Sequence, residues 1–171
     1  MSRRLLVVLA ATTAALTIAI ASVTAASPRN FVTPLSGAEE VPARDTLARG
    51  AAVFQLSADG SSMSWRLIAS NIENVVASHI HIGPAGTNGP VAVFLFGPQP
   101  PAGGRHDGVL SSGTFTAADF VGPLAGLPMS ALVDALESGN AYVNVHTNNG
   151  VDPTNEGPGD FPGGEIRGQL D

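Results

Sequence analysis

The sequence predicts an all-β domain, an antiparallel sandwich or barrel of about seven short strands with one short helix. Apolar and polar residues alternate with a period of two over several short runs, which is typical of strands that bury one face. Segments rich in glycine and proline separate these runs and indicate turns and loops. A single segment carries the apolar spacing of a helix instead.

The expected strands begin with a hairpin. Residues 52–56 and 63–68 flank a loop that contains Asp59 and Gly60, a dipeptide that favours a tight turn. No strand is assigned before residue 52, and His106 is expected in a solvated loop rich in glycine and proline. The other strands are expected at residues 77–82, 91–96, 109–116, 141–147 and 164–170.

The expected helix spans residues 128–138. Pro128 near its start and Gly139 just past its end stand where these residues are common at helix termini. Its apolar residues fall at positions i, i+3, i+4 and i+7, so they would line one face. These residues are Met129, Leu132, Val133 and Leu136.

The first 26 residues predict a signal peptide. Arg3 and Arg4 form a short positive region, residues 5–26 carry no charge, and the segment ends in two alanines of the kind that a signal peptidase accepts. An uncleaved membrane anchor is the alternative, because the uncharged run approaches the roughly 20 residues that a bilayer requires. Threonines and serines dilute the run and favour cleavage, so we expect a secreted or periplasmic protein.

Composition narrows the classes of function. The chain contains no cysteine, which excludes disulfides and thiolate chemistry. All eight basic residues are arginines, and removal of Arg3 and Arg4 leaves six of them against fourteen acidic residues, a net charge of −8. Such an acidic domain is a poor candidate for binding nucleic acid or, once the signal is cleaved, a membrane surface. An extracellular protein or another surface component remains open as a partner.

Three histidines in strand-like runs form the candidate site. His79 and His81 lie two residues apart, so on a strand they would point the same way, about 7 Å from each other. His146 has the matching phase in a later strand. Neutral imidazoles suit Zn and Cu, so we expect the three rings to converge, and a Cu or Zn site is one hypothesis. Structural histidines that bond to backbone carbonyls are the alternative.

Further polar residues share the outward phase of these strands. A merely solvated face would more commonly carry lysine, serine and threonine, so this set indicates a connected polar cluster. Glu165 would be a metal ligand, a carboxylate behind a ligating imidazole, or the partner of Arg167 in a salt bridge. The members of the cluster are Tyr142, Asn144, Glu165 and Arg167.

Four segments of the chain resemble the CHRD domain, first described in chordin. They are residues 35–42, 79–83 together with 88–90, 142–147 and 163–169. The similarity covers residues 31–171, which form the one expected domain. The resemblance implies an antiparallel Greek-key sandwich or barrel, immunoglobulin-like or superoxide-dismutase-like. Growth-factor antagonism is not implied, because this chain lacks the cysteine-rich modules of chordin. Dismutase activity is not implied either, because that copper site needs more histidines than these strands offer.

The residues therefore leave three functions open. The leading hypothesis is a non-catalytic binding or structural module, exported to the cell surface or periplasm. The second is a metalloprotein that holds Cu or Zn through the three histidines. The third is a hydrolase-like enzyme that uses the same cluster without metal. The chain shows no Ser-His-Asp order and no phosphate loop, and its acidic loop at residues 148–162 lacks the alternation of an EF-hand.

Overall fold

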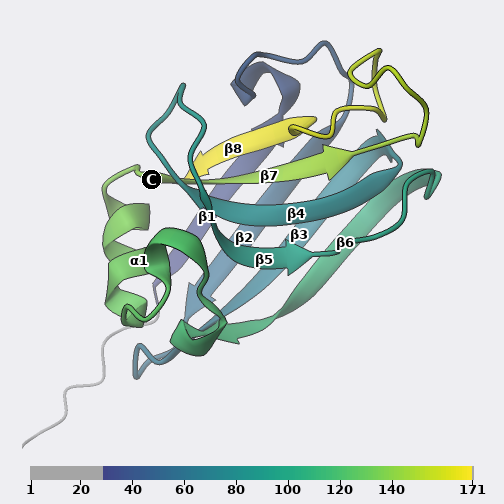
Figure 1. Cartoon of the computed structure of the whole chain (residues 1–171). Coiled ribbons are helices and arrows are strands. Elements are labelled where there is room, and N and C mark those ends of the chain that lie inside the picture. Colours follow the sequence, from purple (N-terminus) through teal and green to yellow (C-terminus); the bar gives the residue numbers. More distant parts are fainter. Residues whose placement is uncertain (1–28, 171) are drawn as a thin grey trace, which may run out of the picture.

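Eight strands form one antiparallel sheet in the order β5-β4-β7-β8-β1-β2-β3-β6 (Figure 1). The structure, a computed structural model, describes residues 29–170. The predicted signal peptide and the last residue of the predicted domain lie outside that range. Within it, no helix combines the length and the apolar character needed to cross a membrane. The strands are β1 (Asn30–Ser36), β2 (Arg49–Leu56), β3 (Ser62–Glu73), β4 (Val75–Ile82), β5 (Val91–Phe96), β6 (Arg105–Thr116), β7 (Ala141–Thr147) and β8 (Ile166–Leu170).

The sheet curves until its two edge strands come close together. β5 and β6 stand at opposite ends of the strand order, yet residues of the two strands contact each other. The result is a nearly closed barrel. Three pairs of neighbouring strands are not consecutive in the chain: β6 pairs with β3, β7 pairs with β4, and β8 pairs with β1. The second of these pairings brings the histidine-bearing segments side by side.

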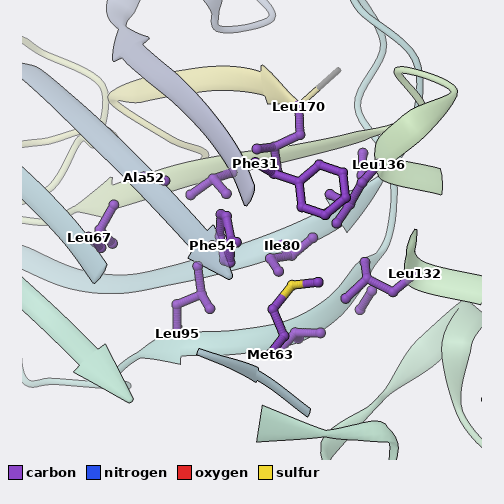
Figure 2. Packing of buried hydrophobic residues seen from close by; sticks show 14 of the residues in the cluster. Phe31, Ala52, Phe54, Met63, Leu67, Ile80, Leu95, Leu132, Leu136 and Leu170 are labelled. Atoms are coloured by element: carbon purple, nitrogen blue, oxygen red, sulfur yellow. The ribbon is translucent and has the colours of Figure 1, made fainter. Parts of the chain in front are cut away.

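The interior of the barrel is apolar because alternate residues of the strands point into it. Ile80 of β4, Val143 of β7 and Phe54 of β2 are buried in one cluster (Figure 2). On β4 and β7 the residues between these core positions point outward. Those outward positions hold the histidines.

The helix α1 (Met129–Glu137) lies at one end of the barrel (Figure 1). Leu132 and Leu136 reach the same core cluster as the strand residues (Figure 2). The helix begins after Pro128 and ends before Gly139, whose φ of 65° is the left-handed conformation that glycine adopts readily after a helix. Three short 3-10 helices complete the list: η1 (Gly37–Glu39), η2 (Ala117–Asp119) and η3 (Gly122–Leu124).

The sequence predicted most of these elements correctly. The helix predicted at residues 128–138 is confirmed as the one α-helix of residues 29–170, and the strands predicted at residues 77–82 and 141–147 are confirmed as well. One strand, β1, was missed, because Thr33 takes an inward position and Pro34 interrupts the apolar alternation. The interpretation of His106 as a loop residue was wrong, since His106 pairs with Ile72 inside β6. β8 begins only at Ile166.

Two loops fold back over the outer face of β4, β7 and β8. The loop between β4 and β5 is fastened there by Arg167 of β8, which donates hydrogen bonds to the carbonyl oxygens of Thr87 and Pro84. The long loop between β7 and β8 is fastened by Glu165, which accepts a hydrogen bond from the backbone N–H of Gly159. Polar side chains on this outer face are therefore buried, although they point away from the core.

Candidate metal centre

Three histidine rings meet on the outer face of β4 and β7. His79 and His81 point the same way, because Ile80 between them is turned into the core. In the register of β4 with β7, Asn144 faces His79, and His146 follows two residues further along β7. One potential ligand atom from each histidine lies within 4.8 Å of the other two. The convergence that strand alternation predicts is confirmed.

Hydrogen bonds orient two of the rings. His81 Nδ1 lies 2.8 Å from the carbonyl oxygen of Gly89, and His146 Nδ1 lies 2.8 Å from that of Pro162. A carbonyl oxygen can only accept, so each Nδ1 donates its proton and each Nε2 keeps a free lone pair. His79 Nδ1 lies 3.1 Å from His146 Nε2. His79 and His146 therefore face each other at hydrogen-bond distance, and His81 Nε2 is the ring nitrogen of the group that has no partner in the described chain.

Burial favours the uncharged form of all three rings. It lowers the pKa of His79 to about 4, and charge on the neighbouring rings of His146 and His81 acts in the same direction. Burial also lowers the pKa of His81 and of His146, and in each case this outweighs the hydrogen bond to a backbone carbonyl. Neutral imidazole is the form that binds a metal. The rings are therefore ready to act as ligands at neutral pH.

Two buried atoms at this centre lack hydrogen-bond partners. Among residues 29–170, neither His81 Nε2 nor Asn144 Oδ1 has one. The two side chains are neighbours, because the Asn144 side chain raises the pKa of His81 by hydrogen bonding, although burial outweighs this effect and lowers that pKa. Buried polar atoms in folded proteins almost always have a partner. Two such atoms at one centre indicate a place for a ligand.

The side chains of His81, Tyr142 and Arg167 form a stack that holds the His81 ring in place. The ring of Tyr142 lies parallel to the ring of His81, with centroids 4.8 Å apart and an interplanar angle of 8°. On Tyr142 the guanidinium carbon of Arg167 lies 3.4 Å from the ring centroid. Arg167 also holds the loop that carries the carbonyl acceptor of His81. The orientation of His81 thus depends on β4, β7, β8 and that loop together.

Comparison of the chain with models of protein families identifies its family. The model of the CHRD domain matches residues 31–170. The chain belongs to the CHRD domain family. No curated protein and no solved structure matches the chain. The matched range contains every residue of the histidine centre, so the centre is part of the CHRD domain itself.

Glu165 of this CHRD domain does not form the expected salt bridge with Arg167. Its fully buried carboxylate accepts hydrogen bonds from Thr46 Oγ1 at 2.7 Å, Thr147 Oγ1 at 2.7 Å and the backbone N–H of Gly159 at 2.8 Å. It does not stand behind an imidazole either, because backbone carbonyls take the Nδ1 protons of His81 and His146. Glu165 instead anchors two loops.

Glu40 is the carboxylate that sequence reasoning missed. It follows η1, is buried, and lies against Gly164, where a side chain would collide with the Glu40 carboxylate. Burial raises the pKa of Glu40 to about 7, although the charges of Arg167 and Arg44 oppose this. Its Oε1 has no hydrogen-bond partner in the described chain. The one sequence signal was its position in residues 35–42, a segment that resembles the family.

The centre lies close to solvent along the edge strand β5. Phe94 is 51% exposed, and its ring meets that of His79 edge to face, with centroids 4.8 Å apart and an angle of 87°. His79 and His146 are themselves only partly buried. A bound ion would therefore remain accessible to small ligands from the side of Phe94.

The remaining candidate residues lie outside the histidine group. His106 is on β6, and within the described chain the group of potential metal ligands contains only His79, His81 and His146. In the acidic loop, Asp160 Oδ2 accepts a hydrogen bond from the backbone N–H of Glu156 at 3.3 Å. That loop contributes to the centre through the Pro162 carbonyl.

Proposed function

We propose that this CHRD domain binds one Cu or Zn ion through His79, His81 and His146. The observation that carries the proposal is the buried Nε2 of His81, which lacks any partner in residues 29–170 while two other imidazoles face it. A structural histidine would have both nitrogens satisfied. The carbonyl bonds to Nδ1 fit a metal centre as well, because ligating histidines usually donate their other N–H to a carbonyl or carboxylate.

The donor geometry supports a tetrahedral ion. Two ligands of an ion with bonds of about 2.0–2.1 Å stand about 3.3 Å apart in a tetrahedron. The separation of His79 Nδ1 and His146 Nε2, 3.1 Å, is close to this value. Three neutral imidazoles suit Zn and Cu and do not suit Ca or Mg, which prefer oxygen ligands. Small shifts of the His81 ring would complete the set.

A non-catalytic role fits the centre better than hydrolysis. In the part of the chain that the structure describes, no carboxylate joins the group of potential ligands. Hydrolytic metal sites typically place a general base next to the bound water. We therefore propose that the domain holds the ion for storage, transfer or recognition by an extracellular partner.

Export and a finer fold assignment belong to the same proposal. The charged start, uncharged run and alanine ending of residues 1–26 support a cleaved signal peptide and a secreted or periplasmic location. The return of β7 to lie beside β4 supports a Greek-key connection. We propose an immunoglobulin-like or superoxide-dismutase-like barrel on that basis.

A binding or structural module without metal is the second candidate. It is favoured by the hydrogen bonds that His81 and His146 make to backbone carbonyls, since these bonds also fasten the two covering loops. On this reading the histidines stabilise the fold, and their removal affects folding alone.

Metal titration of the untagged, secreted protein separates the two candidates. His79→Ala is the informative variant, because His79 bonds to another histidine and not to a loop carbonyl. His106→Ala is the matched control, since it removes an imidazole from β6. We expect wild type and His106→Ala to bind one equivalent of Zn or Cu and His79→Ala to lose that binding. Equal, weak binding by all three proteins would eliminate the metal proposal.

A further inference from the structure

Asn144 occupies the fourth corner of the outward face that holds the three histidines. On β7 it lies between Tyr142 and His146, and across the sheet it faces His79 on β4. Its side chain is also the neighbour of His81. Residues opposite each other or two apart on one face of a sheet have side chains in contact range. Asn144 is therefore within reach of all three rings, from the same outward face of the sheet.

The side-chain oxygen of Asn144 is buried and has no hydrogen-bond donor within the described chain. The residue is 3% exposed, and its Oδ1 finds no hydrogen-bond donor in residues 29–170. Ser78 Oγ donates to the backbone carbonyl of Asn144 at 2.7 Å, so the backbone is held while the side-chain oxygen is left free. A leucine of similar size would fill this position without an unsatisfied oxygen. The amide oxygen thus needs a reason other than packing.

We propose that Asn144 Oδ1 is the fourth protein ligand of the ion, at the corner of the group opposite His79. This inference rests on the proposed function. The three nitrogens and one amide oxygen then form the donor set, and the position on the side of Phe94 stays open to a small ligand such as water or an inorganic anion. An amide oxygen is a hard donor, so the set favours Zn(II) and Cu(II) over the softer Cu(I).

The test replaces Asn144 and compares metal binding with the stability of the metal-free protein. Asn144→Leu removes the oxygen and keeps the volume, and Asn144→Asp replaces the amide with a charged oxygen ligand. Asn30→Leu, on the exposed start of β1, is the matched control. We expect Asn144→Leu to lower Zn affinity between about 10-fold and 100-fold. We expect Asn144→Asp to raise Zn affinity and Asn30→Leu to leave it unchanged.

Two readouts show whether Asn144 acts as a ligand. Metal-free Asn144→Leu should unfold at the same denaturant concentration as wild type or higher, because the substitution removes a buried oxygen that has no hydrogen-bond donor. The visible spectrum of Co(II)-loaded protein should change in Asn144→Leu and Asn144→Asp, because the coordination sphere changes. Wild-type affinity together with an unchanged Co(II) spectrum in both variants would overturn the inference. That result leaves the three-histidine site standing, whereas failure of wild type to bind metal overturns the site itself.

Discussion

On β1, β2 and β3 the outward side chains face solvent, whereas on β4, β7 and β8 they are partly or fully buried beneath loops. Val32 and Val53 are 59% and 37% exposed, but Arg167 is only 1% exposed. Both faces arise from the same alternation of inward and outward residues. The difference lies in the covering loops, which Arg167 and Glu165 fasten. A residue that points away from the core is therefore not necessarily a surface residue, and His81 and Asn144 of the candidate metal centre are buried although they point outward.

The largest expected effect is on the free energy of unfolding when an arginine on each face is replaced by alanine. Arg167→Ala should lower the free energy of unfolding by about 4 kcal/mol, because it leaves buried carbonyls of the β4–β5 loop unpaired and removes the contact with Tyr142. Arg66→Ala, on the exposed face of β3, should change it by less than about 0.5 kcal/mol. Urea denaturation measures both. Similar effects at the two positions would contradict the contrast between the faces.

The second expected effect concerns pH. Because burial raises the pKa of Glu40 to about 7, the folded protein holds a proton that the unfolded chain releases above about pH 4.5. The contribution of Glu40 to stability is therefore greatest in acid and declines as pH rises towards 7, by up to about 3 kcal/mol. The histidines change stability in the opposite direction, since their lowered pKa values make the folded state more stable as pH rises from 4 to 6.5.

Glu40→Gln isolates the carboxylate from the histidines. The difference in unfolding free energy between wild type and Glu40→Gln should fall steadily from pH 4.5 to pH 7 and then stay constant. Urea denaturation at several pH values provides the measurement. A difference independent of pH would show that Glu40 is ionised in the folded protein throughout this range.

A smaller loss is expected at the other buried carboxylate. Glu165→Gln keeps the shape but exchanges one acceptor oxygen for a donor, so one of the bonds from Thr46, Thr147 or Gly159 is weakened. The unfolding free energy should fall by about 2 kcal/mol. Glu39→Gln, at an exposed position next to Glu40, should have almost no effect. Equal effects would mean that the loops are held by other contacts.

The smallest effect is expected on the solvated face. Val53→Thr should change the unfolding free energy by less than about 0.5 kcal/mol, because the side chain already contacts water. The same substitution at Val145, which is fully buried in the barrel, should cost about 2 kcal/mol by burying a hydroxyl. Thermal unfolding of the two variants compares inward and outward positions directly. A large loss of unfolding free energy in Val53→Thr would show that the Val53 side chain makes stabilising contacts on the outer face.

Local patterns were sufficient for most of the fold. Period-two alternation located the strands that carry the histidines, and the spacing of Leu132 and Leu136 located the helix. The same alternation placed His79, His81 and His146 on one face, because side-chain direction on a strand depends only on the immediate neighbours. β1 was missed since Pro34 and Thr33 weaken its local pattern, and its assignment depends on pairing with β2.

The contacts of the two buried carboxylates, Glu165 and Glu40, were not predicted from the sequence. Glu165 has the outward phase of the polar cluster, yet it bonds to two threonines and a loop N–H rather than to Arg167 or an imidazole. Glu40 had no periodic pattern at all and became buried only through its position against Gly164. Which acid stands near which base depends on how the loops close over the barrel, and no short-range spacing encodes that closure.

The sequence by itself determined the strand faces, the helix, the shared phase of three histidines and membership of the CHRD domain family. Tertiary structure alone decided which rings meet, which nitrogens keep their lone pairs and which polar atoms are buried. The physical reason is the distance along the chain between the groups involved. His79 meets His146 across 67 residues, and Arg167 reaches Pro84 across 83 residues. Side-chain periodicity is a property of neighbouring residues, whereas burial and hydrogen-bond partners are properties of the closed barrel and the loops that cover it.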